Sequence, residues 1–191
     1  TNTIAENAAI LGEYIAGVKR ATGARTVDLI AHSMGGLISR AYIDRVMTTR
    51  DVGQLIMLGS PMAGTDCAGL PASLGLYLPA VLEIRPSYVR EIFNPQLSHR
   101  HGVPFHALAG VPILESFKSP CTDVPTDIAV SLSSVTAIPL EASQMPVLHT
   151  DLNTSAQVFN EFVIPLLQTP AGGFADAPDP EAPRLAADRQ Q

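Results

Sequence analysis

The ten residues Val27-Asp28-Leu29-Ile30-Ala31-His32-Ser33-Met34-Gly35-Gly36 carry the strongest indication of how this chain folds. A β-branched and apolar run ends abruptly at Ser33, and two glycines follow before a helical pattern begins. A serine in a tight turn between a strand and a helix is typical of a nucleophile elbow, in which backbone strain exposes the hydroxyl at the sheet edge. Such a turn needs small residues two positions before and two after the serine, and Ala31 and Gly35 meet that need.

The stretch therefore predicts Ser33 as a nucleophile with the N-terminus of the next helix behind it. In this interpretation the elbow around the serine consists of Ala31, His32, Gly35 and Gly36. The alternative is a serine that only caps a helix after a buried strand.

A length of 191 residues indicates a single domain. A composition with 46% apolar and 16% charged residues indicates that this domain is globular. Residues 1–169 are predicted to form its core, whereas residues 170–191 lack hydrophobic periodicity and are predicted to be a disordered tail. A formal net charge of −6 without a basic patch argues against a nucleic-acid partner. No run approaches the roughly 18 consecutive apolar residues of a membrane span, so no transmembrane segment is expected.

Strand and helix patterns alternate along the core. Thr3 and Glu6 have the spacing of a capping box, and apolar residues recur at helical intervals until Gly23, a residue suited to end a helix. Strands are predicted over residues 26–31, 52–58, 103–109 and 145–148, and further helices over residues 35–48 and after Thr154. This alternation predicts an α/β fold, a mostly parallel sheet with helices on both faces. Ligands of such sheets bind beyond the carboxyl ends of the strands.

Residues 66–101 interrupt the alternation and are predicted to form a lid-like insertion. The segment is irregular and broken by prolines, yet it is rich in apolar residues between Leu70 and Ile84. Long connections of this kind are often lids or binding loops. The alternative is a pair of short helices packed on the body of the fold.

A serine hydroxyl is a poor nucleophile at neutral pH and needs a base, usually a histidine that a carboxylate holds in the right tautomer. His149 suits this role, because it is the last histidine and lies between a short apolar strand and the final helix. His106 lies within a predicted strand, and His99 and His101 precede that strand. None of these three is well placed to return to Ser33.

The orienting acid is expected between the serine and the histidine along the chain. Asp127, 22 residues before His149, is favoured over Asp123, which could instead stabilise a turn through its own backbone. The oxyanion of an acyl intermediate needs two preorganised donors. The backbone N–H of Met34, the residue after the nucleophile, supplies one, and the other normally comes from a loop after an earlier strand.

No metal site and no cofactor are predicted. The spacing of His99 and His101 could place both rings on one face of an extended segment, but surface histidines are the preferred interpretation of this weak pattern. Cys67 and Cys121 both lie in loops near the predicted site. Sequence alone leaves open whether they form a disulfide or stay free.

The chain resembles bacterial serine lipases and esterases of the α/β-hydrolase superfamily over about residues 3–168. Besides the elbow, the similarity is carried by weaker matches in Leu37-Ile38-Ser39-Arg40, Leu58-Gly59-Ser60-Pro61 with Gly64-Thr65, Thr126-Asp127-Ile128-Ala129-Val130, and His149-Thr150-Asp151-Leu152. The resemblance implies an acyl-ester hydrolase with Ser33 as nucleophile, Asp127 as acid and His149 as base. It also implies an acyl-ester or lipid substrate and contact with a lipid interface, and it is compatible with secretion.

Three departures from these enzymes are local: Ala31 stands where glycine is usual, Met62 where histidine is common, and the loop before Asp127 is longer and richer in proline. The largest departure is that relatives carry several strands before the first helix, one of which ends in His-Gly and supplies the second oxyanion donor. We therefore expect a partial α/β-hydrolase fold whose N-terminal segment is missing. Two further hypotheses stay open, an acyltransferase or lipid deacylase of the same fold and a non-catalytic remnant.

Overall fold

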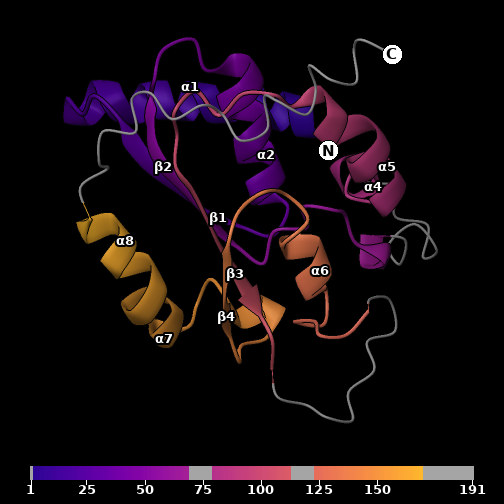
Figure 1. Cartoon of the computed structure of the whole chain (residues 1–191). Coiled ribbons are helices and arrows are strands. Elements are labelled where there is room, and N and C mark those ends of the chain that lie inside the picture. Colours follow the sequence, from indigo (N-terminus) through magenta and orange to yellow (C-terminus); the bar gives the residue numbers. More distant parts are fainter. Residues whose placement is uncertain (1, 69–78, 113–122, 170–191) are drawn as a thin grey trace.

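The computed structural model describes residues 2–68, 79–112 and 123–169, and four strands within them form one parallel sheet (Figure 1). In spatial order the strands are β1 (Val27–His32), β2 (Val52–Leu58), β3 (Phe105–Gly110) and β4 (Ala142–Met145). Because every neighbouring pair is parallel, the carboxyl ends of all four strands lie at the same edge of the sheet. The predicted parallel α/β architecture is confirmed.

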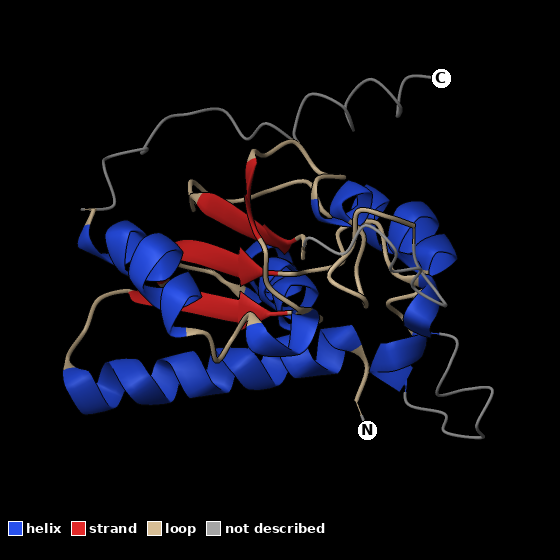
Figure 2. Ribbon diagram, turned by 90° about the horizontal axis from the view of Figure 1, so that it is seen from below, coloured by secondary structure: helices blue, strands red, loops and turns tan. Residues whose placement is uncertain are grey.

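Helices cover both faces of the sheet, as the view in Figure 2 shows. One face carries α1 (Ile4–Thr22), α2 (Gly35–Ala41) and the π-helical turn η1 (Tyr42–Val46). The other face carries α7 (Ala156–Val158), the π-helical turn η6 (Phe159–Val163) and α8 (Ile164–Gln168).

The central position of β2 explains its nearly continuous apolar sequence. All seven of its residues are buried. Leu55 and Met57 pack in the core on the side of α1 and α2, whereas Ile56 and Leu58 pack against the segment from α7 to α8. A strand that is buried on both faces cannot show the polar alternation of a half-exposed strand.

The first helix begins and ends where the sequence predicts. The Thr3 hydroxyl accepts a hydrogen bond from the Glu6 N–H at 3.1 Å, and the Glu6 carboxylate accepts one from the Thr3 N–H at 2.7 Å. The helix ends at Gly23, whose φ of 73° lies in the left-handed region that glycine adopts without steric cost. Ile4, Ala8 and Ile15 form its buried face.

The fourth strand lies earlier in the chain than the predicted residues 145–148. The structure places it at Ala142–Met145. Pro146 accounts for the difference, because proline has no N–H to donate to a strand ladder. The chain leaves the sheet at this proline and turns toward His149.

The last helical segment begins one residue later than its sequence suggests and passes through Pro165. Ser155, rather than Thr154, is the N-cap, and its hydroxyl accepts from the Val158 N–H at 3.4 Å. Pro165 is expected to kink or end the helix, yet α8 continues to Gln168. The wider π-helical turn η6 precedes the proline, where the missing N–H and the ring disfavour regular α-helical bonding.

The described part of residues 66–101 consists of short helical pieces: η2 (Asp66–Ala68), α4 (Pro79–Leu82), α5 (Pro86–Tyr88), η3 (Val89–Phe93) and η4 (Asn94–Gln96). Val89, Phe93 and Leu97 are buried in the same core as α1 and α2. Residues 69–78 and the predicted tail, residues 170–191, lie outside the described residues. A lid and a disordered tail therefore stay predictions. Across the described ranges, no helix has the length and apolar character needed to cross a membrane.

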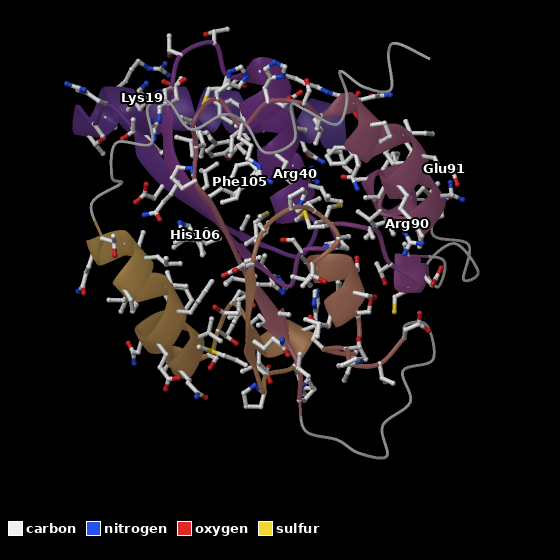
Figure 3. All side chains as sticks on the ribbon, in the orientation of Figure 1. Lys19, Arg40, Arg90, Glu91, Phe105 and His106 are labelled. Carbon is white, nitrogen blue, oxygen red and sulfur yellow. The ribbon has the colours of Figure 1, made fainter. Side chains whose placement is uncertain are left out.

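His106 gives the fold a dependence on pH. It extends from β3 toward the face that α8 covers (Figure 3), and burial lowers the pKa of its imidazole below the ordinary value of 6.5. The unfolded chain therefore binds a proton near pH 6.5 that the folded chain still excludes. Stability from this group is present above about pH 6.5 and is lost as the pH falls through the folded-state pKa.

We expect the free energy of unfolding to fall between pH 7.5 and pH 5 and to fall less steeply in His106→Asn, as measured by urea unfolding at a series of pH values. The half-buried His32, whose pKa burial also lowers, should maintain a residual slope in the variant. Identical slopes for the two proteins would contradict the assignment to His106.

Candidate active site

Ser33 lies in the sharp turn between β1 and α2, in a backbone conformation that serine rarely adopts. Its φ is 54°, in the left-handed region, which costs of order 1–3 kcal/mol for a residue with a side chain. Hydrogen bonds on both sides hold this turn. The Ser33 N–H donates to the Leu58 carbonyl of β2 at 2.9 Å, and the Gly36 N–H donates to the Ser33 carbonyl at 3.1 Å.

The space available for a side chain differs among the small residues of this turn. A Cβ on Gly36 would overlap the side chain of Ser60, so this position requires glycine. A Cβ on Gly35 would meet the Ala31 methyl at 3.7 Å, which is an ordinary contact. Ala31 itself is buried.

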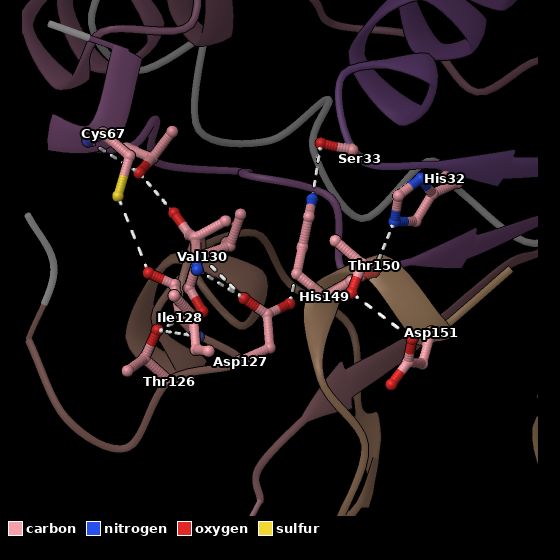
Figure 4. A network of polar contacts seen from close by, with 12 residues as sticks. His32, Ser33, Cys67, Thr126, Asp127, Ile128, Val130, His149, Thr150 and Asp151 are labelled. Atoms are coloured by element: carbon pink, nitrogen blue, oxygen red, sulfur yellow. Dashed lines mark hydrogen bonds and ion pairs between the residues drawn. The ribbon is translucent and has the colours of Figure 1, made fainter. Parts of the chain in front are cut away.

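His149 contacts Ser33 and Asp127 at the same time (Figure 4). Its Nε2 lies 2.9 Å from the Ser33 hydroxyl oxygen, and its Nδ1 lies 2.7 Å from Oδ2 of Asp127. A carboxylate can only accept, so with Asp127 ionised Nδ1 carries the ring proton and Nε2 of the neutral ring accepts from the serine hydroxyl. The structure therefore brings the three predicted residues into one continuous chain of hydrogen bonds.

The Asp127 carboxylate is 1% exposed and is held by three donors. Oδ2 accepts from His149, while Oδ1 accepts from the N–H groups of Ala129 at 3.0 Å and Val130 at 2.7 Å. Ile128, which lies between Asp127 and Ala129, has a φ of 95°, an outlier for a β-branched residue. This conformation folds the backbone so that both N–H groups face the carboxylate. The other predicted candidate, Asp123, is exposed.

The remaining histidines that the sequence offers lie apart from this chain of contacts. His99 and His101 are exposed, with ring centroids 5.7 Å apart, and His106 is half-buried on β3. Within residues 2–68, 79–112 and 123–169, no group of three or more His, Cys, Asp or Glu side chains is arranged to hold a metal ion.

Met34 follows the serine at the start of α2. Among the residues that the structure describes, no group accepts a hydrogen bond from its N–H. The helix that begins here aims its positive end at the turn. This backbone donor is thus available for a negative charge that develops next to Ser33.

Several residues that position the site carry no evident signal in the sequence. The Ser134 hydroxyl donates to the Gly64 carbonyl at 2.7 Å and accepts from the Ala63 N–H at 3.1 Å. The Thr65 hydroxyl donates to the Ala129 carbonyl at 2.5 Å. These bonds attach the loop after β2 to the loop that carries Asp127 and to the short helix that follows it, α6 (Leu132–Val135), across more than 60 residues of chain.

Cys67 belongs to the same junction. It is disulfide-bonded, and its sulfur lies 3.6 Å from the Ile128 carbonyl oxygen. Cys121, the other cysteine of the sequence, lies outside the described residues. A covalent crosslink therefore ends beside the backbone that folds around Asp127.

At Gly59, a single added methyl group should disturb the contact between Asp127 and His149. Its φ is 59°, and an added Cβ would lie 2.6 Å from Leu152, 3.0 Å from Oδ2 of Asp127 and 3.1 Å from Nδ1 of His149. We expect Gly59→Ala to slow the reaction of Ser33 with a fluorophosphonate probe at least tenfold, because the methyl group displaces the carboxylate or the imidazole. Mass spectrometry measures the labelling rate.

Gly23→Ala is the matched control. Gly23 has a φ of 73°, and a Cβ there would meet nothing within 4 Å. Both variants should lose about 1–2 kcal/mol of stability through backbone strain, to which the clash with Leu152 adds in Gly59→Ala, but only Gly59→Ala should lose labelling. Equal labelling of the two variants would show that the crowding at Gly59 is harmless.

Comparison with known proteins identifies chains that are similar in sequence or in fold. The family model of palmitoyl protein thioesterases matches residues 3–93. The mature lipase BlEst2 of Bacillus licheniformis superposes with a TM-score of 0.69 and 20% identity, over 87% of this chain and 75% of that protein. Phospholipase PlaB of Legionella pneumophila gives 0.64 and 14% over 99% of this chain and 52% of its own.

The metagenomic carboxyl esterase MGS0156 gives a TM-score of 0.60 and 17% identity over 99% of this chain and 63% of that protein. The chain thus spans between about half and three quarters of these solved structures. The likeness concerns the fold, which agrees with the parallel sheet. The chain has a partial α/β-hydrolase fold, of the type found in lipases and esterases.

Proposed function

We propose that this chain carries the catalytic residues of a serine carboxylic-ester hydrolase. The observation that supports the proposal is the unbroken chain of hydrogen bonds from the Ser33 hydroxyl through His149 to the buried Asp127. A base that lies 2.9 Å from the nucleophile and 2.7 Å from the orienting acid meets the geometric requirement for nucleophilic catalysis by serine.

In the first half of the reaction, Ser33 attacks the ester carbonyl carbon while its proton passes to Nε2 of His149. The carbonyl oxygen becomes an oxyanion, and the Met34 N–H donates a hydrogen bond to it. Asp127 stabilises the imidazolium. When the tetrahedral intermediate collapses, His149 gives its proton to the leaving alkoxide, and an alcohol departs from an acyl-serine.

In the second half, His149 takes a proton from water and the resulting hydroxide attacks the acyl carbonyl. Collapse of the second intermediate releases the carboxylic acid, and the proton returns from His149 to the Ser33 oxygen. The same base therefore acts in both halves, and no redox step or metal ion enters the balance.

The substrate class that we propose is a lipid or an ester with a medium-to-long acyl chain. Its support is the apolar character of the sequence between Leu70 and Ile84. The proteins of similar fold are a lipase, a phospholipase and a carboxyl esterase, and the matching family model describes palmitoyl protein thioesterases. Apolar side chains that contact a substrate would bind its acyl chain and exclude water from the ester.

Replacement of the nucleophile tests the assignment directly. We expect Ser33→Ala to lose fluorophosphonate labelling and to lower p-nitrophenyl ester turnover by about 10⁵–10⁶. Asp127→Asn should lower kcat by about 10⁴, because the amide favours the wrong imidazole tautomer. Ser87→Ala, at an exposed serine on α5, serves as the control and should react like the parent chain. Turnover that survives Ser33→Ala would reject the proposal, and an unlabelled parent chain would favour a non-catalytic remnant.

The substrate class needs a separate measurement. A series of p-nitrophenyl esters from acetate to palmitate should show kcat/KM rising toward medium or long chains. Product analysis with an added alcohol distinguishes hydrolysis from acyl transfer, because a transferase would form a new ester in preference to the free acid. A preference for acetate would remove the lipid part of the proposal and leave the serine mechanism standing.

A further inference from the structure

We propose that His32, the residue before the nucleophile, is a positioning residue that holds His149 in reach of Ser33 by a hydrogen bond from its ring to the main chain of His149. The inference rests on the proposed function of Ser33 and His149. It assigns a specific task to a side chain that the sequence marks only as part of the elbow.

The contact joins residues that are 117 positions apart in the sequence. Nε2 of His32 lies 2.9 Å from the carbonyl oxygen of His149, and the bond is drawn in Figure 4. The two rings also face each other, with centroids 4.7 Å apart and planes tilted by 42°. His32 therefore touches His149 both at its backbone and at its imidazole.

The chemistry of the two groups fixes the direction of the bond. A carbonyl oxygen only accepts, so Nε2 of His32 must carry a proton and donate it. Burial lowers the pKa of the His32 ring and so favours its neutral form, and the contact with the carbonyl oxygen assigns the single proton of that form to Nε2. A neutral ring also adds no positive charge beside His149 at the moment when His149 takes the serine proton.

The backbone of His149 has few other attachments at this point. It begins the short 3₁₀ turn η5 (His149–Asp151), and among the described residues its carbonyl otherwise accepts only a long bond of 3.4 Å from the Leu152 N–H. On its other side, the His149 N–H donates to the Asp127 carbonyl at 3.0 Å. His32 and Asp127 thus fix the two ends of the residue that carries the base.

Because His32 directly precedes Ser33 in the chain, its contact with His149 affects the distance between Ser33 and His149. Ser33 is its direct neighbour, so the Ser33–His149 distance of 2.9 Å depends on a short path through β1, the His32 ring and the His149 backbone. Within the described part of the chain, the only other hydrogen bond between residues 27–36 and the turn at His149 is the one that joins the reacting atoms themselves. A displacement of about 1 Å in such a geometry lowers rates by about 10².

Two substitutions at position 32 separate the hydrogen bond from the packing of the ring. His32→Phe keeps an aromatic ring and removes the donor, whereas His32→Gln keeps an N–H at a similar reach and removes the ring. We expect His32→Phe to lower kcat on a short-chain p-nitrophenyl ester tenfold or more, with KM within about twofold of the parent value. His32→Gln should recover most of the loss.

The control is His106→Phe, which replaces the other half-buried histidine, on β3, and should leave kcat unchanged. Urea unfolding of each variant shows whether lost activity follows lost stability. Unchanged kcat in His32→Phe would overturn the proposal. Equal loss of kcat in both His32 variants, in step with their stability, would likewise overturn it, since only packing would then matter.

A spectroscopic measurement keeps this inference separate from the proposed function. The contact requires the His32 ring to be protonated at Nε2 and not at Nδ1 near neutral pH, which ¹⁵N spectra of histidine-labelled protein distinguish. If the parent chain fails to label at Ser33 but shows this tautomer, the proposed function fails and the contact stands. The opposite tautomer would overturn the inference whatever the activity.

Discussion

The buried carboxylate of Asp127 is the group on which the arrangement of the site depends. A negative charge that is 1% exposed is strongly unfavourable unless donors surround it. Two backbone N–H groups of its own loop and the His149 ring supply those donors. Because one of the three comes from another part of the chain, the loop after residue 122 and the turn at residue 149 must close on each other. The same closure brings His149 to Ser33.

The parallel sheet makes this closure geometrically simple, because it places the ends of its strands at one edge. Ser33 follows β1 and Gly59 follows β2, while His149 comes after β4 and a short turn. Of the three non-glycine residues with a positive φ in the described part of the chain, Ser33 and Ile128 lie here, and the third, His101, lies in an exposed turn before β3. Such conformations persist only where the surrounding contacts outweigh their cost, and the disulfide at Cys67 and the bonds of Thr65 and Ser134 are contacts of this kind.

Much of the framework is predictable because its causes lie within a few residues. The cap of α1 depends on Thr3 and Glu6, which are three residues apart, and the strands at residues 27–32 and 52–58 follow from local apolar runs. The sequence pattern predicts the fourth strand three residues too late, because the apolar residues after Pro146 resemble a strand whereas the missing N–H of that proline ends the ladder. Arg40 shows the limit of local patterns, since it is 2% exposed and donates to Asn94, 54 residues away.

The sequence by itself determined the alternation of strands and helices, the turn at Ser33 and the short set of histidines and aspartates from which partners could be drawn. Those properties are local, because hydrophobic periodicity and turn chemistry act over a few residues. Only the tertiary structure decided that Asp127 and not Asp123 meets His149, and that His32 bonds to the backbone of that histidine. These contacts join residues 22 and 117 positions apart, so they exist only once the sheet has brought the ends of its strands together.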